Sequence, residues 1–331
     1  MNLPTSTARL RRRPATDAAA GLMLALAATS AYAAPPTQPP APPVPPHHHD
    51  RYADDEDSMA GRAIDERRSL KADARVRVSN VAGSIEIVSW DKNEAYISGE
   101  LGRGADKLDI TGSDGNLEIV VRTPKNTRNV EGSELRIMLP AGVALNVEAV
   151  SADVIVQGIK GKVVAATVSG EMTLSLAADE VEARTVSGDV VVRAPMRNGS
   201  INTVSGDVRA SGGGGRLKLE TVSGDAELVG ASAYSDLSLK SISGDFDVDA
   251  ALTGDGRFVG ETLSGEMRVR LPAATSAQVT LHTFSGDVRS AFGGAVPSGD
   301  ERRERQEFKI GDGRARVDLS SFSGDIVLDK R

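Results

Sequence analysis

Apolar and polar residues alternate in a recurring pattern from about residue 72 to the end of the chain. The triplet Ser-Gly-Asp or Ser-Gly-Glu returns at short intervals, and its glycine serves as an anchor for aligning the repeats. The anchors are Gly170, Gly188, Gly206, Gly224, Gly244, Gly265, Gly286 and Gly324, with Ala152 in a degenerate copy. Their successive spacings are 18, 18, 18, 18, 20, 21, 21 and 38 residues, so we expect one disguised or interrupted repeat in the last interval.

The positions around each anchor predict two strands. Apolar residues occur two and four residues after the anchor, and five and seven residues before it, as at Leu217 and Leu219. This period-2 alternation is typical of strands with one buried face. The position two before the anchor is also apolar, and we expect it to face inward. It holds Val150, Val168, Val186, Val204, Val222, Ile242, Leu263, Phe284 and Phe322. The change from odd to even offsets predicts a corner between the Thr and the Val of Thr-Val-Ser-Gly-Asp.

One such unit cannot fold alone. Burying about five apolar side chains yields on the order of 10 kcal/mol, whereas ordering about 18 residues costs roughly 18 kcal/mol or more. Units stacked about 4.8 Å apart supply the missing hydrogen bonds and apolar contacts. The sequence therefore predicts an all-β fold, a single β-solenoid of about 18-residue rungs with two short strands per rung, over residues 72–331. The same pattern fits around Gly83 and, less well, around Gly115.

The N-terminal segment has the pattern of an exported protein. Arginines at Arg9 and at 11–13, an apolar run over 18–28 and the sequence Ala31-Tyr32-Ala33 predict a signal peptide at residues 1–33. The apolar run is too short to span a membrane. We therefore expect a periplasmic or secreted protein with no membrane span.

Residues 34–71 are predicted to be a disordered linker. Eight of the twelve residues from Pro35 to Pro46 are proline, which favours an extended spacer. A short helix could form over 58–70. His47, His48 and His49 precede a group of aspartates and could ligate a divalent ion, but a flexible tract holds no fixed geometry. We therefore predict no metal and no cofactor.

The repeats carry a family resemblance. The Thr-Val-Ser-Gly-Asp-like units, preceded by the segment from Val78 to Asp91, resemble the bacterial putative-adhesin family over roughly residues 70 to 331. The resemblance implies a β-solenoid with an interaction role in an envelope or secreted protein. It supplies no established catalytic residues.

Composition and motifs favour a protein that is not an enzyme. The chain has no cysteine, which excludes disulfides, thiolate nucleophiles and cysteine-ligated metals, and its net charge of −7 argues against nucleic-acid binding. The common catalytic signatures do not occur. The glycines 212–215 lack a following Lys-Ser or Lys-Thr and are predicted to form a loop. His282 occupies a column of polar residues and is predicted to face solvent.

An acidic residue directly follows each anchor. These residues are Asp153, Glu171, Asp189, Asp207, Asp225, Asp245, Glu266, Asp287 and Asp325. Carboxylates stacked 4.8 Å apart repel by about 0.9 kcal/mol per pair in water. Calcium, or Arg209, Arg268 and Arg289, could offset this repulsion. The alternative is that each carboxylate accepts a backbone N–H at the corner, and we favour this second interpretation.

The interval between Gly286 and Gly324 holds the predicted partner site. A run of turn-forming residues, 292–300, precedes Arg302, Arg303 and Arg305, which would suit an anionic glycan, a lipid head group or the acidic face of an envelope protein. A solvated loop with internally paired charges is the alternative. The sequence thus favours a non-enzymatic envelope adhesin or interaction scaffold. An envelope-stress regulator remains open, as does a polysaccharide-active β-helix enzyme, which the single Trp disfavours.

Overall fold

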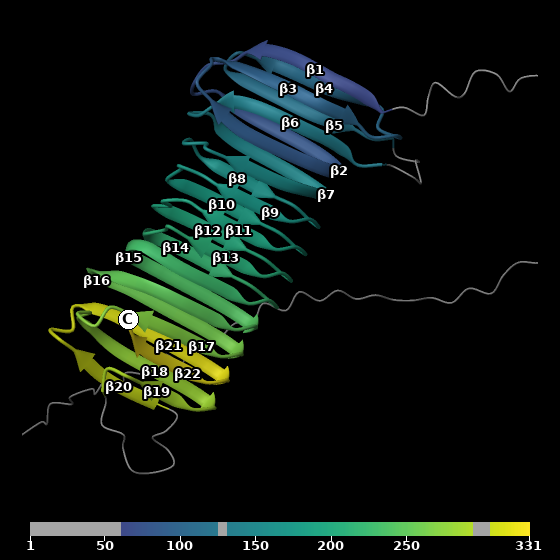
Figure 1. The fold of residues 1–331 in the computed structure, drawn as a ribbon. Helices are drawn as coiled ribbons and strands as arrows, with labels where there is room; N and C mark the ends of the chain where they lie inside the picture. The colour runs from purple at the N-terminus through teal and green to yellow at the C-terminus, as the bar shows by residue number, and fades with distance from the viewer. Residues whose placement is uncertain (1–60, 125–130, 294–304) are drawn as a thin grey trace, which may run out of the picture. The chain divides into compact units, whose positions relative to one another are not determined.

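The computed structural model describes residues 61–124, 131–293 and 305–331, and these residues contain strands and no helix (Figure 1). The predicted all-β class is confirmed. Within these described ranges, twenty-two strands join in one hydrogen-bonded sheet. They are β1 (Arg62–Ser69), β2 (Arg75–Trp90), β3 (Glu94–Leu101), β4 (Lys107–Ser113), β5 (Asn116–Arg122), β6 (Ser133–Pro140), β7 (Ala144–Gln157), β8 (Val163–Ala166), β9 (Met172–Ser175), β10 (Glu180–Arg184), β11 (Val190–Arg193), β12 (Asn198–Asn202), β13 (Val208–Ser211), β14 (Gly215–Glu220), β15 (Ala226–Ser243), β16 (Phe246–Ser264), β17 (Met267–Leu271), β18 (Ala277–Ser285), β19 (Val288–Ser290), β20 (Arg305–Ile310), β21 (Ala315–Ser323) and β22 (Ile326–Lys330).

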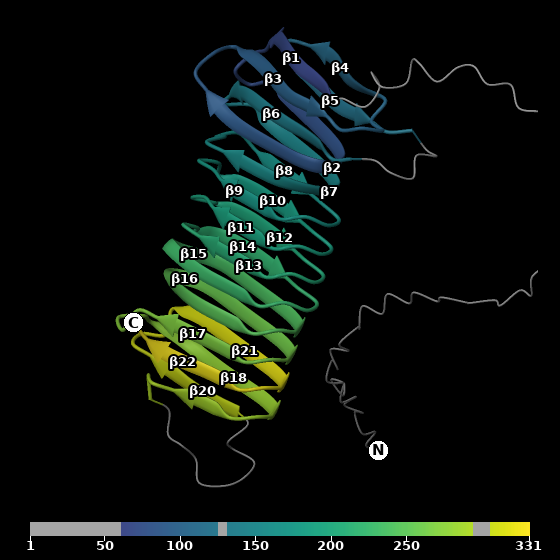
Figure 2. The same ribbon diagram turned by 45° about the vertical axis from the view of Figure 1, so that its right-hand side comes forward.

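Two ladders of parallel strands run through the repeats (Figures 1 and 2). Ladder 1 holds the strand before each corner, in the order β5, β2, β7, β8, β10, β12, β14, β15, β16, β21 and β18. Ladder 2 holds the strand after each corner, in the order β6, β2, β7, β9, β11, β13, β15, β16, β17, β22 and β19. Strands β2, β7, β15 and β16 pass through both ladders without a break, so the two strands of a repeat are separate in some units and merged in others.

The register follows the sequence repeat. In ladder 2, Val190 pairs with Val208, 18 residues later, and Val208 pairs with Ala226 after the same interval. Equivalent residues of successive repeats therefore lie beside one another. Each position of the repeat becomes a column of side chains running along the stack.

Most of the predicted inward columns are confirmed. The residues two and four after the anchor are buried, as at Phe246 and Val248, and so are those five and seven before it, as at Leu239 and Leu237. These columns form one hydrophobic core between the ladders.

The column two before the anchor was predicted inward, and this prediction is wrong. Val204 is 44% exposed, and Phe284 reaches 62%. The residue three before the anchor is buried instead, as at Thr203. Because consecutive residues of an extended strand point to opposite faces, an inward Thr turns the next residue outward. The buried face thus changes phase across Val-Ser-Gly-Asp and not between Thr and Val.

Every anchor except Ala152 is a glycine, and at these glycines the backbones of neighbouring corners approach closely. Gly188 has a φ of 144°, and a Cβ on it would lie 2.2 Å from the carbonyl oxygen of Gly170. The same approach recurs at the other anchors of the stack. A side chain on one of these glycines would therefore force the two repeats apart.

The C-terminal repeat is inserted out of chain order. Strands β21 and β22 lie between β16–β17 and β18–β19, because β21 pairs with both β16 and β18 while β22 pairs with both β17 and β19. Strand β20 runs antiparallel to β18 and covers the end of ladder 1. The prediction of a disguised repeat in the 38-residue interval is therefore wrong for its described part. Phe308 and Ile310 do alternate inward, but on an antiparallel strand.

The N-terminal end has a similar arrangement. Strand β2 lies between β7 on one side and β5 and β6 on the other. Gly115 lies in the turn of the antiparallel β4–β5 hairpin, so its assignment as an anchor is wrong. Residues Arg62–Ser69 form β1, antiparallel to β3, and not the predicted helix. The folded part therefore begins by Arg62, earlier than residue 72.

The corrected phase gives a stability prediction. Val208→Asp should lower the free energy of unfolding by about 3 kcal/mol or more, because Val208 is buried and the carboxylate would have no partner. Val204→Asp should change it by less than about 1 kcal/mol, since Val204 already faces solvent. Urea unfolding of the two variants measures the difference, and equal losses would contradict the assigned phase.

Tyr234 occupies an irregular part of the core. The β14–β15 and β15–β16 pairings shift register beside it. Its ring fills space that side chains on Gly213 and Gly230 would occupy, since a Cβ on either glycine would lie 2.7 Å from a Tyr234 atom. The hydroxyl has no hydrogen-bond partner among the described residues. Burial raises the pKa of Tyr234 to about 12.

Tyr234→Phe should therefore leave stability at neutral pH unchanged or raise it by about 1 kcal/mol, because it removes a buried hydroxyl without a partner. The folded-state pKa lies above the ordinary value of 10, so the parent loses stability as pH rises from 10 toward 12. The variant lacks this loss. Urea unfolding of both proteins at pH 8, 10 and 11 measures it, and a constant difference between them would contradict the prediction.

Candidate functional site: the outer strip at the repeat corners

The corners present a continuous row of exposed apolar side chains, here called the apolar column. It comprises, in the order of the stack, Val81, Val150, Val168, Val186, Val204, Val222, Ile242, Leu263, Phe322 and Phe284. Of the twelve large hydrophobic residues that are exposed in the described part of the chain, these ten lie in this one column. The side chains become larger toward the C-terminal end. There the rings of Phe284 and Phe322 stack with centroids 4.9 Å apart and planes 9° apart.

The acidic residues that follow the anchors, here called the acid column, run beside the apolar column. At each residue of the acid column, two residues separate the two columns, and they are Ser-Gly everywhere except at Ser151-Ala152. Backbone hydrogen bonds join the corners of successive repeats. The N–H of a corner serine donates to the carbonyl of the apolar-column residue in the preceding repeat, as from Ser205 to Val186 at 2.8 Å. We call the apolar column, the Ser-Gly pairs and the acid column together the corner strip.

The aspartates of the acid column accept backbone N–H groups, as the sequence predicted. Oδ1 of Asp207 accepts from the N–H of Asp225 at 3.0 Å, and Oδ1 of Asp225 accepts from the N–H of Asp245 at 2.8 Å. The same bond joins Asp153 to Glu171, Asp189 to Asp207, Asp245 to Glu266, and Asp325 to Asp287. Each of these carboxylates therefore helps to join its repeat to the next.

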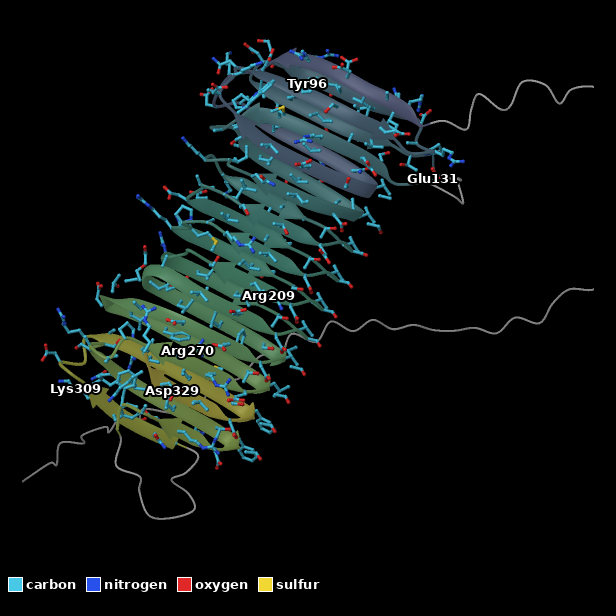
Figure 3. The ribbon with its side chains drawn as sticks, viewed as in Figure 1. Tyr96, Glu131, Arg209, Arg270, Lys309 and Asp329 are labelled. Carbon is cyan, nitrogen blue, oxygen red and sulfur yellow. The ribbon has the colours of Figure 1, made fainter. Side chains whose placement is uncertain are left out.

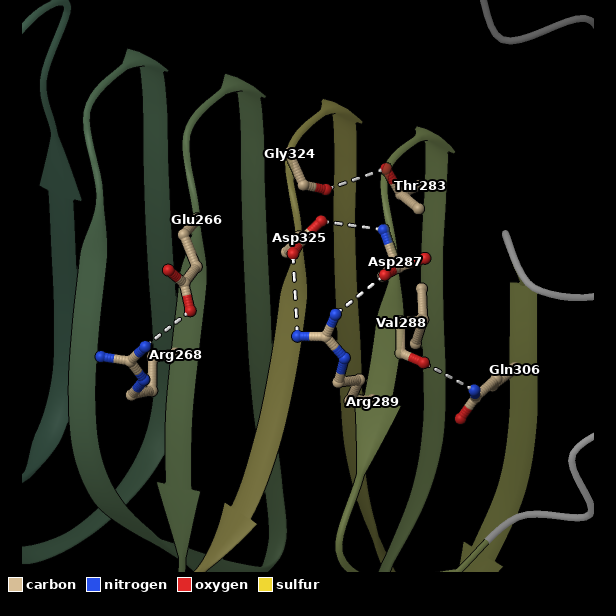
Figure 4. Close-up of polar contacts among 9 residues, drawn as sticks. All are labelled: Glu266, Arg268, Thr283, Asp287, Val288, Arg289, Gln306, Gly324 and Asp325. Carbon is tan, nitrogen blue, oxygen red and sulfur yellow. Dashed lines mark hydrogen bonds and ion pairs between the residues drawn. The ribbon is translucent and has the colours of Figure 1, made fainter.

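Two of the three predicted arginine partners reach the acid column (Figure 4). Arg268 pairs with Glu266 at 2.8 Å, and Arg289 pairs with Asp287 at 2.8 Å and more distantly with Asp325 at 3.9 Å. Arg209, labelled in Figure 3, pairs with Glu227 at 3.8 Å, outside the acid column. All these pairs are exposed, so each contributes little to stability.

A shallow groove of about 400 Å³ borders the acid column over β13, β15, β16 and β17. Its charged lining consists of Asp207, Arg209, Asp225, Glu227, Asp245, Asp247, Glu266 and Arg268. Six carboxylates thus face two guanidinium groups, which leaves the groove negative. Within the described ranges no three His, Asp or Glu side chains converge as metal ligands would.

The predicted partner site lies mostly outside the described residues. Arg302 and Arg303 belong to the undescribed segment, so their role stays a prediction. Arg305 begins β20, and its Nε donates to Glu307 at 3.0 Å. For Arg305, this pairing agrees with the alternative prediction that the charges of the segment pair with one another. The signal peptide, the proline-rich linker and His47–His49 also lie outside the described residues.

Two other predicted features are placed as expected. Gly212–Gly214 form the connection between β13 and β14, and Gly215 begins β14. His282 is exposed on β18. Sequence reasoning missed the apolar column as a surface. The available signal was the threonine before Val168, Val186, Val204 and Val222, because an inward threonine turns the next residue outward.

The match to a family model covers residues 64–329, over most of the chain, and that model describes Toastrack DUF4097. The chain belongs to the Toastrack DUF4097 family. The match to this family model confirms the predicted family resemblance. No curated protein with a matching sequence was found.

Several solved structures match this Toastrack domain at low sequence identity. A putative adhesin from Parabacteroides merdae has 9% identity and a TM-score of 0.39, and the match covers 81% of this chain and 96% of that one. A putative cell adhesion protein from Clostridium sporogenes has 11% identity and a TM-score of 0.23, covering 82% and 100%. A putative adhesin from Bacteroides fragilis has 12% identity and a TM-score of 0.29, covering 82% and 98%. The described residues contain no helix long and apolar enough to cross a membrane.

The acid column gives a prediction that separates hydrogen bonding from charge. Asp207→Ala removes the acceptor for the N–H of Asp225 and should cost about 1 kcal/mol of unfolding free energy. Asp207→Asn keeps an acceptor oxygen and removes one repelling charge, so its stability should equal or exceed that of the parent. Urea unfolding at 20 mM and 500 mM NaCl tests this. Equal losses in both variants would show that the charge itself is required.

Proposed function

We propose that this protein is a non-enzymatic, exported envelope scaffold that binds a partner through the corner strip. In this proposal the repeats form a single β-solenoid with two strand segments per rung, and the solenoid acts as a rigid support. The export step rests on the signal-peptide pattern of residues 1–33. The binding role rests on the apolar column.

The apolar column is the observation that carries the proposal. Soluble proteins rarely expose a contiguous apolar patch without a use for it. Nine intervals of about 4.8 Å give the column a length of about 40 Å, and its ten side chains face solvent along that length. A stack of repeats generates such extended binding surfaces, because one outward position is copied at every turn.

The hydrogen bonding of the acid column favours a scaffold over an enzyme. In six repeats an aspartate oxygen is fixed on the N–H of the next repeat. A general acid or base must be able to reach a substrate proton and usually differs from its neighbours in environment. These carboxylates instead repeat one structural role from rung to rung.

A pull-down with a matched control tests the proposal. The bait is the chain from residue 34 to 331, immobilised and exposed to an envelope extract. The apolar-column variant is Val186→Thr/Val204→Thr/Val222→Thr, which keeps side-chain shape and lowers apolarity. The control variant is Glu182→Thr/Ser200→Thr/Lys218→Thr, at side chains outside the core on the strands of ladder 1.

The parent and the control should retain a defined partner, and the apolar-column variant should retain at least about tenfold less. Melting temperatures measured in parallel verify that all three proteins are folded. Equal retention by the apolar-column variant would place binding elsewhere. If the parent cleaved an added envelope polysaccharide, the proposed scaffold function would be wrong and the protein would be an enzyme.

A further inference from the structure

We infer that the corner strip binds a polypeptide segment in which apolar and basic side chains alternate. This inference rests on the proposed function and names the chemistry of the partner. It follows from three properties of the strip: its two parallel columns, its charge and its spacing.

The two columns lie close enough for one linear ligand to touch both. Three residues of extended chain span at most about 10 Å, and three steps along the chain separate each apolar residue from the acidic residue of the same corner, as from Val204 to Asp207. The serine and glycine between them carry almost no side chain. A segment lying along the strip would therefore have apolar groups on one flank and carboxylates on the other.

The charge of the strip selects the sign of the partner. The acid column has nine carboxylates, and Arg268 and Arg289 are the arginines paired with it in the described part of the chain. The adjoining groove adds Glu227 and Asp247. Anionic lipids, nucleic acids and acidic glycans would be repelled by this surface. A second copy of the chain brings the same net charge of −7 and a second acid column.

The apolar column excludes a simple cation as the complete ligand. A metal ion or a polyamine could satisfy carboxylates but would leave ten apolar side chains in water. A purely apolar ligand would remove water from the neighbouring carboxylates without giving them a new hydrogen-bond or charge partner. Both columns are satisfied together only when a ligand carries apolar and cationic groups on opposite sides.

An extended polypeptide supplies this arrangement directly. Alternate side chains of an extended strand point to opposite sides, so a segment of alternating apolar and basic residues would direct one set to the apolar column and the other to the acid column. The groove of about 400 Å³ beside Asp207, Asp225 and Asp245 offers room for lysine or arginine side chains.

The test uses three labelled twelve-residue peptides with blocked ends: alternating Leu-Lys, alternating Leu-Glu and alternating Ser-Lys. Fluorescence anisotropy with residues 34–331 measures their affinities at 50 mM and 200 mM NaCl. We expect the Leu-Lys peptide to bind at least tenfold more tightly than either other peptide. Its affinity should fall with salt, because the screening length shortens.

Variants of the protein localise the binding. Asp207→Asn/Asp225→Asn/Asp245→Asn keeps the acceptor oxygens and removes three charges, and it should weaken Leu-Lys binding at least tenfold. The variant Val186→Thr/Val204→Thr/Val222→Thr should have a similar effect. The control Glu182→Thr/Ser200→Thr/Lys218→Thr should bind like the parent.

Several results would overturn the inference. Binding of the Leu-Glu peptide as tight as that of Leu-Lys would remove the charge argument, and equal binding of Ser-Lys would remove the apolar one. Binding to vesicles of phosphatidylcholine with phosphatidylglycerol, without binding of Leu-Lys, would assign the apolar column to a membrane. If the bait retains an envelope partner through the apolar column but does not bind Leu-Lys, the scaffold function stands and only this partner chemistry fails.

Discussion

The close approach of glycine backbones at the corner is the constraint on which the rest of the structure depends. A Cβ on Gly206 would lie 2.2 Å from the carbonyl oxygen of Gly188, and a Cβ on Gly224 would lie 2.3 Å from that of Gly206. Because these glycines have no side chain, each corner packs directly against the preceding one. The strands on both sides of the corner are therefore paired in parallel register. The hydrogen bond from each aspartate to the next N–H reinforces this register at the same place. The corner therefore sets the alignment of both ladders.

This alignment also creates the surface that we propose as the binding site. Once the repeats are in register, an outward residue cannot be isolated, because its equivalents in the neighbouring repeats lie beside it. One exposed valine per repeat becomes a continuous apolar column, and one aspartate per repeat becomes a column of charge. The structural and interaction roles of Val-Ser-Gly-Asp thus come from the same four residues. Glycine fixes the spacing, aspartate links the repeats, and valine is left facing outward.

The sequence predicted the parts of the fold that depend on local alternation and failed where tertiary geometry decides. The period of 18 residues, the buried columns such as Leu217 and Val208 and the carboxylate hydrogen bonds could be read from the pattern. The outward turn of Val204 could not, because valine is apolar and period-2 alternation is ambiguous at a corner, where the chain changes direction. The insertion of β21–β22 between earlier repeats was also beyond the sequence, since its register with β16 and with β18 is equally compatible with the pattern. Tyr234 fills a gap that exists only because Gly213 and Gly230 lie next to it in space.

The corner strip combines two features that are each unfavourable in the unbound protein. Half-exposed side chains of the apolar column keep apolar area in contact with water, at roughly 25 cal/mol for each Å² left unburied. The acid column holds like charges at the spacing of the stack, and its aspartate Oδ1 atoms already serve backbone N–H groups. A residue of the apolar column that needed only to complete a corner could be small and polar, as the neighbouring serines are. A ligand with apolar and cationic flanks would bury the apolar area and neutralise the carboxylates together. A ligand with only one of these properties would leave the other unfavourable feature in place or make it worse. The physical cost of the strip in the free state is therefore the strongest reason to regard it as an interaction surface and not as a by-product of repetition.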